Sequence, residues 1–193
     1  MRRLVLALPL MLALGACRSG IDTAEWTEEV RLSDGKTVVV WRKARAYSNG
    51  FPNAPRGGWV DVEFAYKPMQ VHYKSTFRHD YYRNPMAFDV IDGVAYLVVR
   101  ALDEGFCVGR PKLHYTAQFL RWSEGQWIEV PQEQFPLERV QVNLYTDYWG
   151  HTSADDAKGL ITWEMNFPNG RKPRSIKDEF EATGWNCQML LKE

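Results

Sequence analysis

The chain has 193 residues, of which 45% are hydrophobic, and its 24 basic residues balance its 24 acidic residues. This length is enough for one domain with a hydrophobic core of its own. A neutral balance without a long basic run argues against nucleic acid as a partner, because binding to the phosphate backbone requires clustered positive charge.

The first 16 residues have the pattern of an export signal. Arg2 and Arg3 precede a run from Leu4 to Leu14 that contains no charged residue. A basic start followed by a short apolar run is typical of a secretory signal peptide. The run is too short to be a permanent membrane span, which takes about 20 helical residues. We therefore expect residues 1–16 to be removed on export.

The segment 14–17 reads Leu-Gly-Ala-Cys. It resembles the lipobox of bacterial lipoproteins, in which a leucine and two small residues precede a cysteine. The resemblance, which covers only the first 17 residues, implies that Cys17 is lipidated and begins the mature chain. Two or more acyl chains hold a protein firmly at a membrane. The alternative is an ordinary secretory protein with a cysteine near its cleavage site.

The residue after the lipobox cysteine bears on the membrane that holds the protein. Arg18 stands where, in enteric bacteria, an aspartate marks a lipoprotein for retention at the inner membrane. The resemblance therefore implies a location in the cell envelope, with the lipid in the outer membrane and the folded domain facing the periplasm.

Once Cys17 is lipidated, Cys107 and Cys187 remain as a pair. An exported protein folds in an oxidising compartment, where paired cysteines form disulfides. We predict a Cys107–Cys187 disulfide; the alternative is two separate buried thiols. Neither cysteine has a second one at C-x-x-C spacing, so the sequence does not indicate a zinc site. No metal or cofactor is expected.

The mature chain divides into a spacer, residues 17–25, and a single β-rich domain, residues 26–193. Apolar and polar residues alternate from Trp26 to Leu32, as in a half-buried strand. The Asp-Gly pair at 34–35 favours a tight turn into a returning strand, 36–41. Further strands are predicted at 58–66, 69–77, 137–145 and 159–167, with a long loop at 48–58.

The segment 86–100 predicts a hairpin that turns at Asp92 and Gly93. This turn places Phe88 opposite Leu97. Both faces of the hairpin are largely apolar, so we expect it to be covered on both sides, near the middle of the domain.

A further hairpin is predicted over residues 113–130, with Trp122 opposite Trp127. Ser175–Thr183 is the one helical candidate, because Ser175 suits the N-cap and Gly184 follows its last residue. The predicted fold class is therefore all-β, a single antiparallel β-sandwich or barrel-like domain built from hairpins with one short C-terminal helix.

Basic and aromatic residues are interleaved between positions 66 and 83. This composition suits a surface that meets anionic glycan, lipid headgroups or a partner protein. The interpretation that we favour is a strand at 69–77 that has Val71, Tyr73 and Ser75 on one face and leaves its basic residues in solvent. The candidate binding residues of this stretch are Tyr73, Lys74, Arg78, His79, Tyr81 and Tyr82.

A second candidate stretch, 145–156, is polar and contains glycine, which predicts an exposed loop. Binding residues often lie on such loops. Aspartates near a histidine suit acid–base chemistry or cation binding, whereas polarity alone is also what solubility requires. The candidate residues here are Asp147, Trp149 and His151.

The standard signatures of catalysis, G-x-S-x-G, G-x-x-x-x-G-K and H-E-x-x-H, are missing from the sequence. Together with the lipid anchor, this favours a non-catalytic envelope protein that binds a partner protein or an envelope polymer. One alternative is a hydrolase of cell-wall or surface glycan that uses acidic residues of the 145–156 loop. Another is a small-ligand carrier with an apolar barrel interior.

Overall fold

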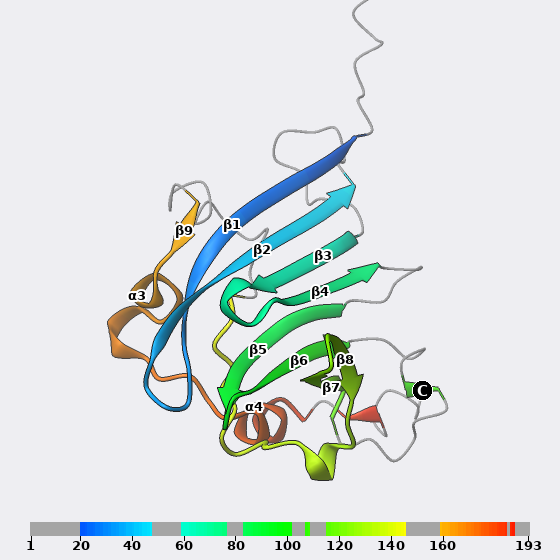
Figure 1. Cartoon of the computed structure of the whole chain (residues 1–193), viewed down its shortest axis with the longest axis vertical. Helices are drawn as coiled ribbons and strands as arrows, with labels where there is room; N and C mark the ends of the chain where they lie inside the picture. The colour runs from blue at the N-terminus through cyan, green and yellow to red at the C-terminus, as the bar shows by residue number, and fades with distance from the viewer. Residues whose placement is uncertain are drawn as a thin grey trace, which may run out of the picture.

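The computed structural model describes residues 20–47, 59–76, 83–101, 107–108, 115–145, 159–184 and 186–187. These residues form two β-sheets, which confirms the predicted all-β fold class (Figure 1). Sheet A has the strand order β4-β3-β2-β1-β9 and sheet B the order β5-β6-β7-β8.

Sheet A consists of four antiparallel strands and one short parallel strand, β9, at its edge beside β1. Its strands are β1 (Ile21–Arg31), β2 (Thr37–Tyr47), β3 (Trp59–Tyr66), β4 (Val71–Thr76) and β9 (Leu160–Ile161). Sheet B is antiparallel throughout. Its strands are β5 (Arg83–Ile91), β6 (Val94–Ala101), β7 (Ala117–Ser123) and β8 (Gln126–Glu129).

In the described ranges, the helical elements with assigned bounds lie in the connections and in the C-terminal part. They are η1 (Lys67–Met69), η2 (Gln132–Gln134), α3 (Trp163–Asn166), η3 (Pro168–Gly170) and α4 (Ile176–Thr183). The Ser175 hydroxyl accepts a hydrogen bond from the Asp178 N–H at 3.1 Å, and Gly184 ends α4 in the left-handed conformation. The predicted helix and both of its ends are thus confirmed.

The first hairpin forms where alternation and the Asp-Gly pair predicted it, but it is longer than expected. Gly35 has a φ of 87°, which only glycine adopts at little cost. β1 begins at Ile21, which pairs with Tyr47 at the far end of β2. Residues 21–25, predicted as spacer, therefore belong to sheet A.

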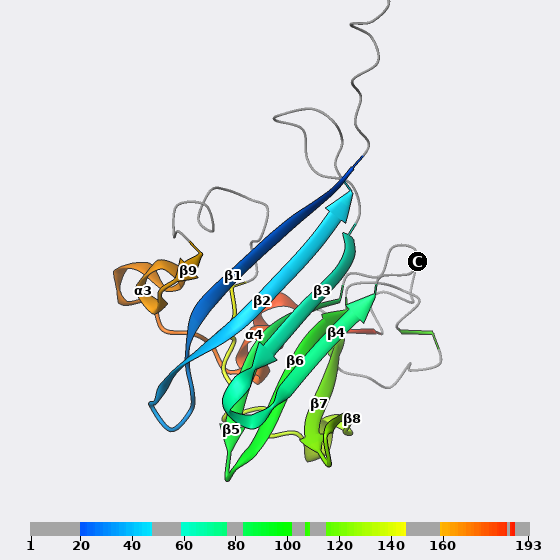
Figure 2. The same cartoon turned by 45° about the horizontal axis from the view of Figure 1, so that its top comes forward.

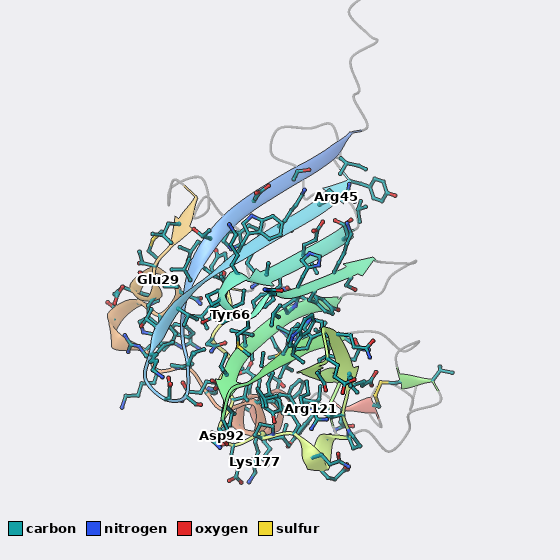
Figure 3. All side chains as sticks on the ribbon, viewed as in Figure 1. Glu29, Arg45, Tyr66, Asp92, Arg121 and Lys177 are labelled. Atoms are coloured by element: carbon teal, nitrogen blue, oxygen red, sulfur yellow. A yellow bond between two sulfur atoms is a disulfide. The ribbon has the colours of Figure 1, made fainter. Side chains whose placement is uncertain are left out.

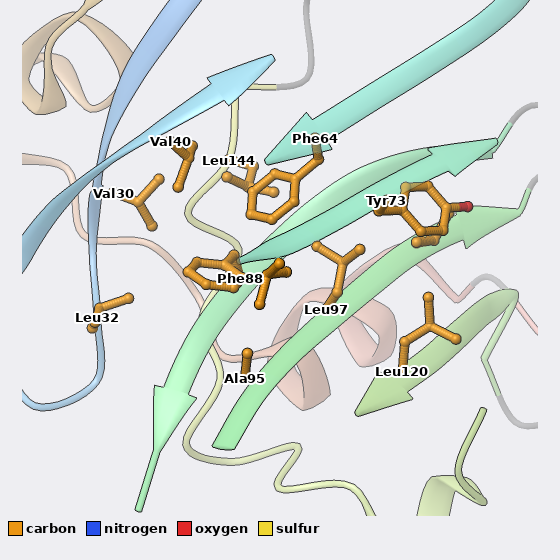
Figure 4. Close-up of a cluster of buried hydrophobic side chains, with 12 residues drawn as sticks. Val30, Leu32, Val40, Phe64, Tyr73, Phe88, Ala95, Leu97, Leu120 and Leu144 are labelled. Atoms are coloured by element: carbon orange, nitrogen blue, oxygen red, sulfur yellow. The ribbon is translucent and has the colours of Figure 1, made fainter. Parts of the chain in front are cut away.

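The two sheets pack face to face around one apolar core, in which Phe64 and Phe88 lie with ring centroids 4.9 Å apart (Figure 4). Sheet A lies over sheet B, with α4 behind sheet B (Figure 2). The buried members of this core are Val30, Leu32, Val40, Phe64, Val71, Tyr73, Phe88, Ala95, Leu97, Val99, Leu120 and Leu144.

The opposite face of sheet B is buried as well, against α4 and the chain around η2. Ile176 and Phe180 of α4 pack on this face, and the Phe119 and Phe135 rings lie 4.9 Å apart. The β5–β6 hairpin therefore lies between two layers, with Phe88 opposite Leu97. Its predicted burial on both sides is confirmed, and so is the pairing of Trp122 with Trp127 across β7 and β8.

Two predicted strands are wrong over most of their length. Residues 137–145 contain a turn and an irregular extended segment, in which Gln141 makes one isolated bridge to Ser175. In the 159–167 stretch only Leu160–Ile161 is strand. Helix α3 follows because the Thr162 hydroxyl caps it by accepting from the Met165 N–H.

Asn143 explains why the 137–145 segment lies beside β5 without forming a regular ladder. Its buried side-chain amide accepts from the Phe88 N–H at 2.9 Å and donates to the Phe88 carbonyl at 2.7 Å. It also donates to the Arg31 carbonyl at 3.0 Å, so one side chain joins β1 to β5. The side-chain amide thus meets both backbone groups of Phe88, and the Leu144 N–H adds a backbone hydrogen bond to the Met86 carbonyl of β5 at 3.2 Å.

The predicted disulfide is present. Cys107 and Cys187 are bonded, with their Cα atoms 5.2 Å apart, and both are buried beside Ala101. The bond ties the chain that follows β6 to the chain that follows α4. Closing a loop of 80 residues stabilises the fold chiefly by restricting the unfolded chain.

Candidate binding face

Most of the binding residues predicted from the sequence lie outside the described residues. The structure places Tyr73 and Lys74, both on β4. Those outside are Arg78, His79, Tyr81, Tyr82, Asp147, Trp149 and His151, together with the lipidation residue Cys17.

The structure does not bring Tyr73 and Lys74 together. Successive side chains of a strand point to opposite faces. Tyr73 is 9% exposed and belongs to the core between the sheets, so it is not an exposed binding residue. The side chains of Lys74 and His72 are 46% and 54% exposed on the other face. The interpretation as a strand with solvated basic residues is confirmed over Val71–Thr76, whereas Met69 belongs to η1 and residue 77 lies outside the described residues.

Lys74 belongs to a surface that we call the outer face of sheet A, the side that points away from sheet B. Its charged and polar residues come from all four long strands and stand in cross-strand register. The face comprises Thr23, Glu25, Thr27, Val39, Trp41, Lys43, Arg45, Asp61, Glu63, Ala65, His72 and Lys74.

A ladder of alternating charge crosses the middle of the outer face. Glu25 on β1 is opposite Lys43 on β2, which is opposite Glu63 on β3, which is opposite Lys74 on β4. Opposite charges at directly facing positions stabilise a sheet. The Lys74 ammonium lies 3.0 Å from Glu63, and His72 Nε2 lies 3.4 Å from the same carboxylate. Burial by itself would raise the pKa of Glu63, but these contacts outweigh it and lower that pKa.

The neighbouring row contains a tighter ion pair, between Arg45 and Asp61 (Figure 3 labels Arg45). The Arg45 Nε–H donates to Asp61 Oδ1 at 2.8 Å, and a second guanidinium nitrogen donates to the other carboxylate oxygen. Lys74 adds a charge 3.8 Å away. Chiefly through the Arg45 hydrogen bonds, the pKa of Asp61 is held below its usual range.

Trp41 forms the aromatic part of the outer face. Its indole N–H donates to Glu25 Oε1 at 2.8 Å, which fixes the ring on the sheet. Its cross-strand neighbours are Thr27 and Ala65, so small side chains flank the ring in that row. Val39, two residues before it on the same face, is 52% exposed. The face therefore offers apolar area among its charges.

This arrangement suits binding better than acid–base chemistry. Asp61 and Glu63 stand two residues apart on β3, about 7 Å by strand geometry. A glycosidase needs one carboxyl whose pKa is raised, so that it carries the proton to be donated. The pKa values of both Asp61 and Glu63 are lowered, so both are carboxylates at neutral pH. On this face the carboxylates Asp61 and Glu63 neutralise the charges of Arg45 and Lys74.

Sequence reasoning missed a buried ion pair between Glu28 and Arg42, whose side chains are each 1% exposed. An Arg42 nitrogen donates to Glu28 at 2.9 Å, the Trp26 indole N–H donates to Glu28 at 3.1 Å, and the Tyr145 N–H donates to it at 3.3 Å. Burial raises the pKa of Glu28 despite Arg42. The sequence did contain a signal for this pair, because Glu28 on β1 and Arg42 on β2 each interrupt a series of apolar residues that point into the core.

Arg42 also reaches the second sheet, where it donates to the Pro85 carbonyl of β5 at 3.2 Å. The pair therefore joins β1, β2 and β5 inside the fold. Neither charge is accessible to a ligand in this conformation, so the pair has a structural role.

No protein-family model, curated protein or solved structure matches the chain. Within the described ranges, no three His, Cys, Asp or Glu side chains are grouped so that they could hold a metal ion. No helix in the same ranges is long and apolar enough to cross a bilayer.

Proposed function

We propose that this protein is a non-catalytic binding protein of the bacterial envelope, tethered by lipid on Cys17, which holds a partner protein or an envelope polymer on the outer face of sheet A. The observation that supports it is the character of that face. It is a solvent-facing sheet surface with ordered, neutralised charges, a fixed tryptophan and exposed apolar area. The inward faces of both sheets are buried in the core, so they offer no binding surface.

The proposed tether restricts where such a partner lies. β1 begins at Ile21, so residues 18–20 are all that separates Cys17 from sheet A. An extended chain spans about 3.5 Å per residue, so sheet A starts within about 15 Å of the lipid. A partner on the outer face therefore meets the protein close to the membrane surface.

The other two functions considered from the sequence have less support. The hydrolase depended on the 145–156 loop, which is described only at Tyr145. A small-ligand carrier requires an apolar cavity, whereas Phe64, Phe88 and Leu97 pack together between the sheets.

A crosslinking pull-down of the tagged, lipidated protein from its own envelope tests the proposal. The informative variant is Lys74→Glu, which reverses one charge of the outer face. Its matched control is Lys177→Glu on α4, because Lys177 lies 3.0 Å from Glu138 and is 43% exposed, close to the values for Lys74 (Figure 3). A Cys17→Ser variant tests the tether.

We expect a discrete partner, protein or glycan, that the wild type and the Lys177→Glu variant retain equally. The Lys74→Glu and Cys17→Ser variants should lose it. Equal retention by the two lysine variants, or no partner in any sample, would overturn the assignment of the outer face as the binding surface.

A further inference from the structure

The charge ladder of the outer face matches a second copy of itself read in the opposite order, because each charge then meets one of opposite sign. Read from β1 to β4, the row is Glu25, Lys43, Glu63, Lys74, so its charges alternate from one end to the other. A second copy turned by 180° about an axis parallel to the strands presents the row in the opposite order. Glu25 then faces Lys74, and Lys43 faces Glu63, at every one of the four positions.

We propose that the partner held by the outer face is a second copy of this chain, packed sheet against sheet about a two-fold axis that runs parallel to the strands. This inference rests on the proposed function, because it names the occupant of the same surface. A two-fold interface is self-complementary by definition, so each residue of the row must suit its counterpart. The alternating ladder meets this condition.

The neighbouring rows are compatible with the same axis. Arg45 and Asp61 occupy the two central positions of the next row, so the rotation places Arg45 of each copy over the Arg45–Asp61 pair of the other. The Asp61 side chain is 2% exposed and bound by Arg45 of its own chain, so the charges of this row are already paired within each copy. In the row on the other side, Trp41 and Ala65 are central, and the large ring meets a small residue. Large-to-small contact between facing sheets is what close packing requires.

The alternative two-fold axis in the plane of the face, perpendicular to the strands, gives the opposite result. It leaves each strand over itself, so that Glu25 faces Glu25 and Lys43 faces Lys43 of the second copy. It also points the two β1 strands in opposite directions. With the axis parallel to the strands, both β1 strands start at the same end, and both Cys17 lipids enter one membrane.

The size of the face indicates a weak dimer. Four strands at about 4.8 Å spacing and an average length of about 30 Å give about 600 Å² for each copy. Stable interfaces bury about 800 Å² on each partner. Anchoring in one membrane raises the effective concentration of the copies and offsets this deficit. In such an interface the charges fix register and orientation more than affinity.

Charge reversal of one central pair provides a test that separates association from folding. Lys43→Glu makes the row Glu, Glu, Glu, Lys, so two copies of this variant bring residue 43 against Glu63 twice. Glu63→Lys makes it Glu, Lys, Lys, Lys, and two copies bring Lys43 against residue 63 twice. One copy of each variant restores opposite charges at all four positions.

The experiment co-expresses two differently tagged, lipidated full-length copies, crosslinks them in the intact membrane, extracts them in mild detergent, captures one tag and quantifies the other. Each variant paired with itself should show about tenfold less co-capture than wild type, since two like-charge contacts replace two attractive ones. The mixed pair should return to the wild-type level, and Lys177→Glu paired with itself should not change.

Wild-type co-capture at background, or a mixed pair no better than either variant alone, would overturn the second copy as the occupant. Neither result bears on the envelope pull-down, in which an outer-face-dependent partner other than this chain would still support the proposed function. A misfolded variant cannot produce recovery in the mixed pair, so recovery supports the dimer.

Discussion

Replacing Arg42 by methionine removes the cation from a pair whose two side chains are each 1% exposed. Glu28 then keeps its hydrogen bonds from Trp26 and Tyr145 but loses the opposite charge 2.9 Å away. Breaking a buried ion pair by removing one partner costs about 3–5 kcal/mol. We expect a loss of this size in the free energy of unfolding at pH 7.

The double variant Glu28→Gln/Arg42→Met should be more stable than Arg42→Met alone. The Trp26 indole N–H and the Tyr145 N–H donate to different carboxylate oxygens of Glu28, so the side-chain amide that replaces the carboxylate keeps an acceptor for one of them, and no uncompensated charge remains. Replacing both members of a buried pair by uncharged residues of similar volume is often close to neutral. We expect the double variant to recover at least about half of the loss.

The pH dependence of the single variant follows from the pKa of Glu28. Burial raises this pKa above its usual value of 4.5, and the contacts with Arg42 oppose the rise. Without Arg42 the pKa rises further. A carboxyl whose pKa is higher in the folded state loses stability as the pH rises through the folded pKa. The deficit of Arg42→Met should therefore be largest at neutral pH and shrink as the pH falls toward 4.5.

Urea unfolding followed by tryptophan fluorescence at several pH values measures these differences. Arg121→Met, an exposed change on β7 (Figure 3), is the control and should stay within about 0.5 kcal/mol of wild type. The reasoning is refuted if Arg42→Met loses less than about 1 kcal/mol, or if its deficit does not change with pH.

Three further variants test other parts of the fold. Asn143→Ala should lower the free energy of unfolding by about 2–4 kcal/mol in urea titrations, because it leaves buried backbone groups without partners. Replacing both Cys107 and Cys187 by serine should cost up to about 4.5 kcal/mol, measured by thermal unfolding against the oxidised wild type. Arg45→Met should destabilise at neutral pH, with a deficit that vanishes as acid protonates Asp61, whose pKa Arg45 lowers; a pH-independent deficit would contradict this origin.

The hairpins could be predicted from the sequence because their signals are local. Alternation set the inward faces of β1 and β4, and glycine at positions 35 and 93 supplied the positive φ that tight turns need. The α4 helix was found for the same reason, since Ser175 and Gly184 satisfy the backbone groups at its two ends. The expectation of an oxidising compartment led to the prediction of the Cys107–Cys187 disulfide, which the structure contains.

The two strand predictions that failed depended on partners distant in sequence. Residues 137–145 alternate apolar and polar side chains enough to predict a strand, but beside β5 the Asn143 amide bonds Phe88 and the Leu144 N–H bonds the Met86 carbonyl, without a regular ladder. In the other segment, a local cap at Thr162 starts a helix and ends the strand after Ile161. Local pattern does not reveal which edge of which sheet a segment meets.

The candidate binding face was predicted only in part for the same reason, namely that its residues are distant from one another in the sequence. The sequence identified Lys74 as a surface residue but grouped it with Tyr73, which adjoins it in the chain and lies on the opposite face. Glu25, Lys43 and Glu63 come from three other strands, and only the pairing of those strands sets them in one row. The sequence by itself determined the hairpins and the caps of α4, because each follows from neighbours in the chain, and the cysteine count determined the disulfide partners. The tertiary structure decided the charge ladder and the buried Glu28–Arg42 pair, because side-chain contacts across strands depend on sheet order and register.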